Sequence, residues 1–230
     1  MASNDSRIGL TVLLRAILSL GGLFLVPAVL MLLPAGVGWQ NGWLFLAVLS
    51  TLTILNVGYL WRANPDILVA RSNFHPETKA WDKVLVIFFV VSFIAIFPVA
   101  GLDARFGWSS VPFWLMLLGY GPMVLAFLVS TWAFRVNKFA EPGVRVHEAQ
   151  KVVDTGPYAY VRHPLYLAAV FLFLGIALAL GSLRALVPAA IASLLLVVRT
   201  ELEDRTLKEE LEGYKEYAGR VRYRLVPGVW

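Results

Sequence analysis

The stretch "VRHPLYLAAVFLFLGIALALGSLRALVPAAIASLLLVVRTELED" (residues 161–204) decides the fold of this chain. An apolar run follows Pro164, and only the four residues 181–184 separate it from a second apolar run that leads into the charged residues from Arg199. Two apolar runs joined by so short a segment predict a tight helical hairpin whose two ends lie on the same face of a membrane. We therefore expect His163 and Arg199, which are distant in sequence, to be neighbours in space.

The composition predicts a polytopic membrane protein. Hydrophobic residues make up 59% of the chain and charged residues only 15%, whereas about 25% of the residues of a soluble domain are charged. There is no cysteine, which excludes disulfides and thiolate metal sites. The three histidines are far apart and lack the spacing of metal ligands, so we expect no metal site.

Apolar segments and basic loops predict the topology. Six segments are apolar over nearly the roughly 20 residues that a spanning helix needs: residues 10–33, 42–60, 84–100, 111–134, 164–180 and 185–198. Lysine and arginine gather in 61–83, in 135–163 and after residue 198, while the alternate loops carry few. Because basic loops stay cytoplasmic, we expect an all-α protein with about six transmembrane helices, both termini cytoplasmic and a helical cofactor pocket on the cytoplasmic side.

The two parts of the chain differ in character. Residues 1–134 read as an N-terminal transmembrane region of four spans, and residues 135–230 as a catalytic region that holds most of the polar groups. The catalytic region would comprise a cytoplasmic loop, the hairpin and a cytoplasmic helix. The charged segment after Arg199 contains no proline as far as Tyr217, so we expect the last span to continue through it as one helix.

Polar side chains at the ends of the hairpin suggest a ligand site. Pro164 suits the first turn of a helix, and the preceding N–H groups, with Arg162 and His163, would attract a carboxylate or a phosphate. Arg199 and Glu203 are four residues apart and share a helix face, whereas Asp204 reads as part of the wet face. Plainer interpretations are an interfacial anchor at residues 162–164 and a surface ion pair between Arg199 and Glu203.

Several motifs occur in an order that resembles a known family. "GPYAYVRHPLY" (156–166) is followed by the apolar hairpin, by "RTELED" (199–204) and by a tyrosine-rich, basic end that closes with "RLVP" (224–227). Over residues 147–227 this pattern is similar to the isoprenylcysteine carboxyl methyltransferase family, and phospholipid methyltransferases share its broader outline. Two departures stand out: Asp204 replaces the second glutamate of a pair, and Glu212-Gly213 replaces a Phe-Gly.

The resemblance implies that S-adenosyl-L-methionine binds to the C-terminal third of the chain. It implies that Arg199 contacts the carboxylate of the acceptor. It also implies these cofactor-binding residues: Gln150, Lys151, Val152, Val153, Tyr158, His163, Pro164, Leu165, Tyr166 and Glu203.

The reaction that the resemblance implies is methyl transfer to a lipophilic acceptor, which is expected to be the carboxylate of an isoprenylcysteine-like molecule. A carboxylate is already ionised at neutral pH and needs no general base, which agrees with the lack of a triad or paired-acid motif. The expected partners are the lipid bilayer and a lipophilic or lipidated acceptor, without nucleic acid or metal. The alternatives are a phospholipid or amine N-methyltransferase, an NADPH-dependent membrane reductase and a non-catalytic membrane scaffold.

Overall fold

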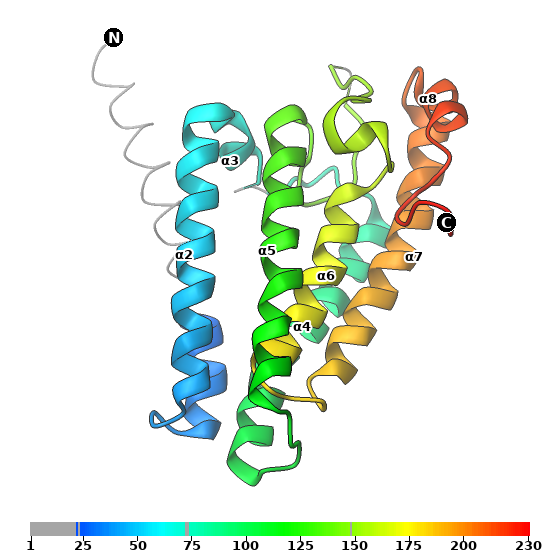
Figure 1. Cartoon of the computed structure of the whole chain (residues 1–230). Coiled ribbons are helices and arrows are strands. Elements are labelled where there is room, and N and C mark those ends of the chain that lie inside the picture. The colour runs from blue at the N-terminus through cyan, green and yellow to red at the C-terminus, as the bar shows by residue number, and fades with distance from the viewer. Residues whose placement is uncertain (1–21, 23, 72–73, 148) are drawn as a thin grey trace.

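The computed structural model describes residue 22 and residues 24–71, 74–147 and 149–230 (Figure 1). The regular structure of these residues is entirely helical, which confirms the all-α prediction for this part of the chain. The helices are Phe24–Ala35, α2 (Gln40–Ala63), α3 (Pro65–Arg71), α4 (Ala80–Phe106), α5 (Phe113–Val136), the 3₁₀ turn η1 (Gly156–Ala159), α6 (Pro164–Ala179), α7 (Leu186–Glu210) and α8 (Tyr214–Arg220).

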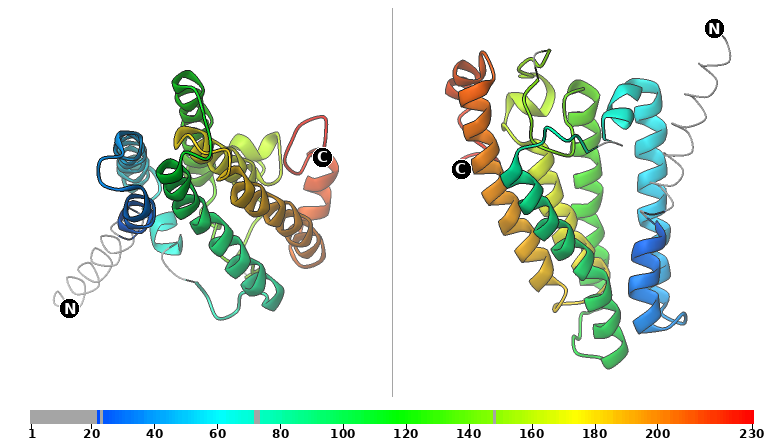
Figure 2. Two further views of the ribbon diagram at one scale, coloured as in Figure 1. Left: turned by 90° about the horizontal axis from the view of Figure 1, so that it is seen from below. Right: turned by 180° about the vertical axis from the view of Figure 1, so that it is seen from behind.

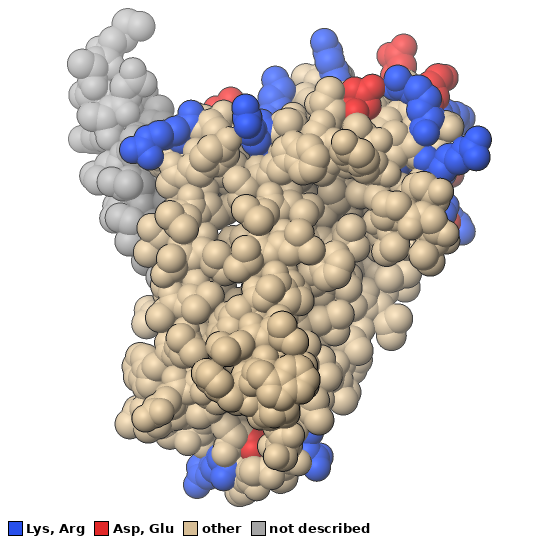
Figure 3. All heavy atoms as spheres, viewed as in Figure 1, with Lys and Arg blue, Asp and Glu red and all other residues tan. Residues whose placement is uncertain are grey.

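Three of the described helices, α2, α4 and α5, are long and apolar enough to cross a membrane, and two more, Phe24–Ala35 and α6, are apolar but shorter. On the face drawn in Figure 3, charged side chains gather at the two ends of the molecule and leave an apolar band between them. These features fit an integral membrane protein. The first predicted span, 10–33, lies largely outside the described residues, so the count of six spans and their orientation stay predictions.

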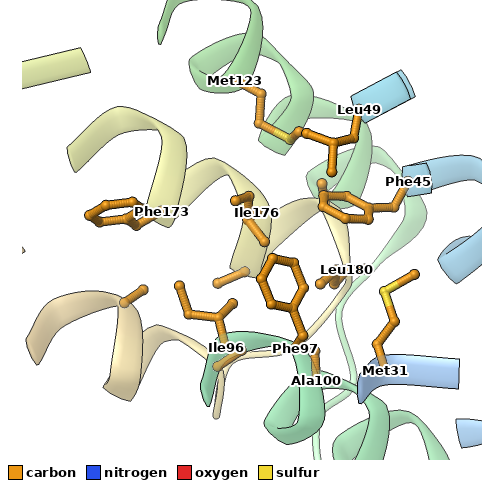
Figure 4. Close-up of a cluster of buried hydrophobic side chains, with 14 of the residues drawn as sticks. Met31, Phe45, Leu49, Ile96, Phe97, Ala100, Met123, Phe173, Ile176 and Leu180 are labelled. Carbon is orange, nitrogen blue, oxygen red and sulfur yellow. The ribbon is translucent and has the colours of Figure 1, made fainter. Parts of the chain in front are cut away.

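The helices of the bundle pack closely against one another (Figure 2). Helix α5 packs against α6, and α7 packs against both α4 and α6. A Cβ atom at Gly119 of α5 would lie 2.5 Å from the backbone nitrogen of Ala179 in α6, so only glycine permits this approach. Figure 4 shows the apolar core, in which Phe45, Phe97 and Ile176 from different helices meet.

The predicted hairpin is confirmed, because α6 and α7 pack side by side and are joined by a short turn. Gly181 adopts a φ of +72° in this turn, a conformation that favours glycine. The prediction of one continuous helix to Tyr217 is wrong. Helix α7 ends at Glu210, and Gly213, with a φ of +78°, redirects the chain into α8. Helix α3 lies within the segment 61–83 that was expected to be a loop.

One end of the bundle carries α3, the segments 137–147 and 149–155, and α8, and we call it the α8 end (Figure 1). Most of the charged side chains visible in Figure 3 lie at this end. The division at residue 134 stays a prediction, but helices from its two sides pack against each other, α5 with α6 and α4 with α7. The polar wall described next is therefore built from both parts of the chain.

Candidate active site

A cavity of about 1180 Å³ opens between the helices and reaches the α8 end. Every residue proposed from the sequence for cofactor or acceptor binding lines it: Gln150, Lys151, Val152, Val153, Tyr158, His163, Pro164, Leu165, Tyr166, Arg199 and Glu203. His163 and Arg199 are thus on one cavity wall, as the hairpin predicted. The individual roles of these residues stay proposals.

The start of α6 differs from the expectation in one respect. Pro164 occupies the first turn and His163 is the N-cap, as predicted. The N–H groups before the proline are not free, however, because Arg162 donates to the carbonyl of Tyr223 (3.0 Å) and His163 to that of Arg224 (2.9 Å). The C-terminal tail therefore satisfies the donors that the sequence had suggested for a ligand.

Asp204 lies at the centre of a polar cluster beside the start of α6. It is fully buried, whereas the sequence had suggested that it belongs to the solvated face of its helix. Its carboxylate accepts hydrogen bonds from Arg162 (2.7 and 3.0 Å), Lys208 (2.7 Å), Tyr214 (3.1 Å) and Arg224 (3.1 Å). The Nε2 atom of His163 is 3.6 Å from Oδ1 of the same carboxylate.

This environment changes the acidity of Asp204. Burial alone would raise the pKa of the carboxyl, but the nearby His163 and the hydrogen bonds from Arg162 and Lys208 outweigh burial and hold its pKa well below the usual range. Arg162 also donates to the carbonyls of Val221 (2.7 Å) and Arg222 (2.8 Å). Because Arg162 is buried and fully paired, it is neither an interfacial anchor nor a cation free to bind a ligand.

Tyr166 connects the two halves of the hairpin inside the cavity. Its hydroxyl donates a hydrogen bond to the carboxylate of Glu203 on α7. Its ring stacks on the imidazole of His163, with centroids 5.6 Å apart and planes 5° from parallel. The guanidinium of Arg199 lies 5.3 Å from the centroid of the same ring. Tyr166 therefore contacts Glu203 through its hydroxyl and both His163 and Arg199 through its ring.

Arg199 does not form the surface ion pair with Glu203 that was one interpretation of the sequence. It is buried and pairs with Asp82 of α4 through Nε (2.7 Å) and Nη2 (2.9 Å), and Nη2 also donates to the carbonyl of Pro142 (2.7 Å). Asp82 in turn accepts a hydrogen bond from the N–H of Val144 (2.7 Å). The Nη1 atom of Arg199 has no hydrogen-bond partner among the described residues.

Asp82 was missed from the sequence, where it is a single acid at the start of an apolar run. It joins α4, α7 and the segment that follows α5, which are far apart along the chain. A hydrogen bond of 3.0 Å from the N–H of Lys79 to the carbonyl of Val144 reinforces this junction. An unpaired acid near a membrane is costly in free energy, so the sequence could have suggested that Asp82 has a partner. It could not have identified that partner.

Gln150 and Tyr158 complete the polar wall. The Oε1 atom of Gln150 is buried and has no hydrogen-bond partner among the described residues. Tyr158 is buried, which raises the pKa of its hydroxyl, and its carbonyl accepts a hydrogen bond from Tyr217 (2.7 Å). Tyr217 belongs to a small apolar cluster with Leu207, Leu211 and Tyr214 that packs α8 against α7.

The site and its surroundings match a known protein family. Residues 114–212 match the family model described as phospholipid methyltransferase. The comparison with curated proteins found no match. The matched region includes all the residues proposed from the sequence, begins earlier than the resemblance at 147, and ends next to the departure at Glu212-Gly213.

This match favours a methyltransferase over the reductase and scaffold alternatives, and it implies S-adenosylmethionine as the methyl donor. Phospholipid methyltransferases and isoprenylcysteine carboxyl methyltransferases fall in one group, so the resemblance seen in the motifs is confirmed. Residues 114–212 of the chain are thus similar to this group of integral membrane methyltransferases.

Proposed function

We propose that the protein transfers a methyl group from S-adenosylmethionine to the carboxylate of a lipophilic, isoprenylcysteine-like acceptor. The observation that carries this proposal is the cavity. Its wall at the α8 end holds the polar residues named above, and the rest of its wall is mainly apolar, with Leu49, Phe93, Phe127 and Leu172 from four different helices. One continuous cavity can thus hold a polar cofactor and an apolar acceptor chain.

The polar wall has the groups that this cofactor requires. Glu203 is half-buried and can pair with the ammonium of the amino acid part, while Lys151 is an exposed cation at the rim that can meet its carboxylate. The buried Oε1 atom of Gln150 is an acceptor without a donor among the described residues, and a hydroxyl or amine of the nucleoside would satisfy it. These three side chains therefore fit the polar groups of S-adenosylmethionine.

When bound, S-adenosylmethionine supplies an electrophilic methyl group on a positively charged sulfur. The chain's own contribution is alignment and exclusion of water. We assign to Nη1 of Arg199 the orientation of the acceptor carboxylate, since the other side of this guanidinium is fixed by Asp82 and Pro142.

Phospholipid N-methylation is the second candidate, and the description of the matching family favours it. An ammonium acceptor must first lose a proton, so this reaction needs a base. Among the described residues the cavity has two carboxylates on its wall, Glu141 and Glu203. Arg145 holds Glu141 through two hydrogen bonds (2.5 and 2.7 Å), and Tyr166 occupies Glu203. Because Glu203 is also the group that we assign to the cofactor's ammonium, neither carboxylate is left as a base, and we prefer the carboxylate acceptor.

Two measurements test the function. Isothermal titration of the purified protein in detergent should show binding of S-adenosylmethionine, and no binding at millimolar cofactor would contradict the proposal. Incubation with methyl-tritiated cofactor and prenylated cysteine should then give base-labile label, as expected of an ester. Base-stable label in phosphatidylethanolamine would instead establish the second candidate.

Glu203→Gln tests the assignment of the cofactor's ammonium. Losing a charge-assisted hydrogen bond costs about 1.5–3 kcal/mol, which corresponds to a roughly 10- to 150-fold weaker cofactor affinity in the titration. The matched control is Glu201→Gln on the same helix, because Glu201 pairs with Arg205 and Arg224 and does not line the described part of the cavity wall. Equal affinities in both variants would remove Glu203 from the cofactor site.

A further inference from the structure

Arg71 is a second arginine on the wall of the candidate cavity. It is the last residue of α3, which follows α2 after the single residue Asn64. Its guanidinium lies 4.8 Å from the centroid of the Phe134 ring, and Nη1 donates to the carbonyl of Ala140 (3.1 Å). The turn before α3 is itself held to α5, because the side chain of Asn64 donates to the carbonyl of Phe134 (2.6 Å). The position of Arg71 is therefore well defined.

Arg71 is exposed and can therefore meet a ligand, and it lacks the carboxylate partner that the other arginines of the cavity wall have. The other arginines of the cavity wall have carboxylate partners: Arg145 with Glu141, Arg162 with Asp204 and Arg199 with Asp82. No carboxylate of a described residue lies within 4.0 Å of Arg71. Arg71 and Arg199 are also close enough for their positive charges to repel each other. A bound anion would remove this repulsion and complete the hydrogen bonding of Arg71.

The part of the cavity wall that includes Arg71 also suits the polar end of an acceptor. The cavity wall also includes apolar and weakly polar side chains of α2 and α5, among them Leu60, Ser130 and Phe134, whose ring lies beside the Arg71 guanidinium. An acceptor chain in that part of the cavity would bring its anionic end to the guanidinium. On the other side, Tyr158 and Tyr166 belong to the polar wall that we assign to the cofactor.

We propose that Arg71 binds the anionic group of the lipophilic acceptor, as a second arginine beside Arg199. This assignment rests on the proposed methyl transfer. A guanidinium presents paired N–H donors that match the two oxygens of a carboxylate, and it matches a phosphodiester equally well. The shared chemistry is a lipid-linked anion, so Arg71 would serve the isoprenylcysteine-like and the phospholipid acceptor alike.

The test uses the purified full-length protein with three substitutions. Arg71→Gln removes the charge, and Arg71→Lys restores the charge without the paired donors. Arg62→Gln is the control, since Arg62 is an exposed arginine in the last turn of α2 and is not among the described cavity residues. For each protein, the cofactor Kd and the melting temperature are measured with the acceptor KM and kcat.

Both acceptor classes are used with labelled cofactor. N-Acetyl-S-farnesylcysteine gives base-labile label and phosphatidylethanolamine gives base-stable label, which distinguishes the carboxylate from the phospholipid as the source of the anion. For the acceptor that the wild type methylates, Arg71→Gln should raise KM 10- to 100-fold with an unchanged cofactor Kd. Arg71→Lys should recover part of the loss, and Arg62→Gln should behave as wild type.

A competition experiment separates anion binding from a structural role. N-Acetyl-S-farnesylcysteine should compete with a labelled acceptor at least 10-fold better than its uncharged amide in the wild type. This preference should disappear in Arg71→Gln. Methyl transfer by the wild type together with an unchanged KM and preference in Arg71→Gln would overturn the assignment of Arg71 alone. Absence of cofactor binding by the wild type would overturn the proposed function, and this assignment with it.

Discussion

Asp204 and Asp82 are both fully buried carboxylates at the α8 end. Each accepts two hydrogen bonds from one arginine, through the Nε and Nη2 atoms of its guanidinium. Around Asp204, Lys208, Tyr214 and Arg224 use the remaining acceptor capacity. Around Asp82, the N–H of Val144 is the one further donor among the described residues. The carboxylate of the first cluster has no acceptor capacity to spare, whereas in the second cluster Nη1 of Arg199, a residue of the cavity wall, has no hydrogen-bond partner among the described residues.

This difference suggests separate purposes for two similar ion pairs. The Asp204 cluster joins α6, α7 and the C-terminal tail, and it contains more positive groups than one carboxylate neutralises. The Asp82 pair joins α4 to α7 and to the segment after α5, next to the proposed acceptor site. We therefore expect the loss of Asp204 to act mainly on stability and the loss of Asp82 to act on both stability and turnover.

The largest effect is expected from Asp204→Asn. Removing the acid leaves Arg162, Lys208 and Arg224 without their shared counter-charge, and breaking a buried pair typically costs about 3–5 kcal/mol. The free energy of unfolding can be measured by SDS titration followed by circular dichroism. Glu209→Gln, at an exposed position of the same helix, is the control. If the free energy of unfolding falls no more than in the control, the Asp204 cluster does not stabilise the fold as expected.

Asp82→Asn should cost somewhat less, about 3 kcal/mol, because one arginine rather than three charged groups loses its partner. Turnover should fall as well, since the guanidinium of Arg199 is no longer held toward the cavity, while cofactor affinity should be preserved. The double variant Asp82→Asn with Arg199→Gln should recover part of the stability, because no buried charge is then unpaired, but none of the turnover. A double variant as unstable as Asp82→Asn would contradict this coupling.

Acid should weaken the Asp204 cluster. The pKa of Asp204 is lowered in the folded state relative to about 3.9 in an unfolded chain. Its contribution to stability is therefore fully present above about pH 4 and is lost as the pH falls further toward the folded-state pKa. Melting temperatures of the wild type and Asp204→Asn should differ most near neutral pH and converge below about pH 4. A constant difference down to pH 3 would contradict the lowered pKa.

The smallest effect is expected at a surface pair of the same length. Arg205 and Glu201 are 2.7 Å apart on α7, but the side chain of Arg205 is 66% exposed. Such pairs contribute less than about 0.5 kcal/mol, so Arg205→Gln should leave the SDS unfolding curve nearly unchanged. A loss above about 1 kcal/mol would mean that burial is not what distinguishes the two aspartate clusters.

Sequence reasoning succeeded where interactions are local. Pro164 at the first turn and the short turn at 181–184 depend on neighbouring residues, and both were correctly predicted. The polar residues around the hairpin line one cavity because the hairpin returns the chain to the same end. The break at Gly213 was missed, since a single glycine within a charged, helix-compatible segment is a weak signal.

The pairing of charges could not be predicted in the same way. The spacing of Arg199 and Glu203 favoured an ion pair between them. In the structure Arg199 pairs with Asp82, and Glu203 accepts a hydrogen bond from Tyr166. Likewise, the charged surroundings of Asp204 suggested a solvated face, whereas the tail from residue 222 covers it. These partners come from separate elements, and no local pattern records which elements pack together.

The sequence by itself determined the class of protein, because hydrophobicity, the spacing of apolar segments and ordered motifs act locally or in sum. It also determined which short stretches face one another across the hairpin. The tertiary structure alone decided which buried charges are neutralised, bringing Asp82 to Arg199, and it left the exposed Arg71 without a carboxylate of a described residue within 4.0 Å. The physical reason is that a charge out of water is stabilised by whatever lies within a few ångströms in space, whatever its distance along the chain.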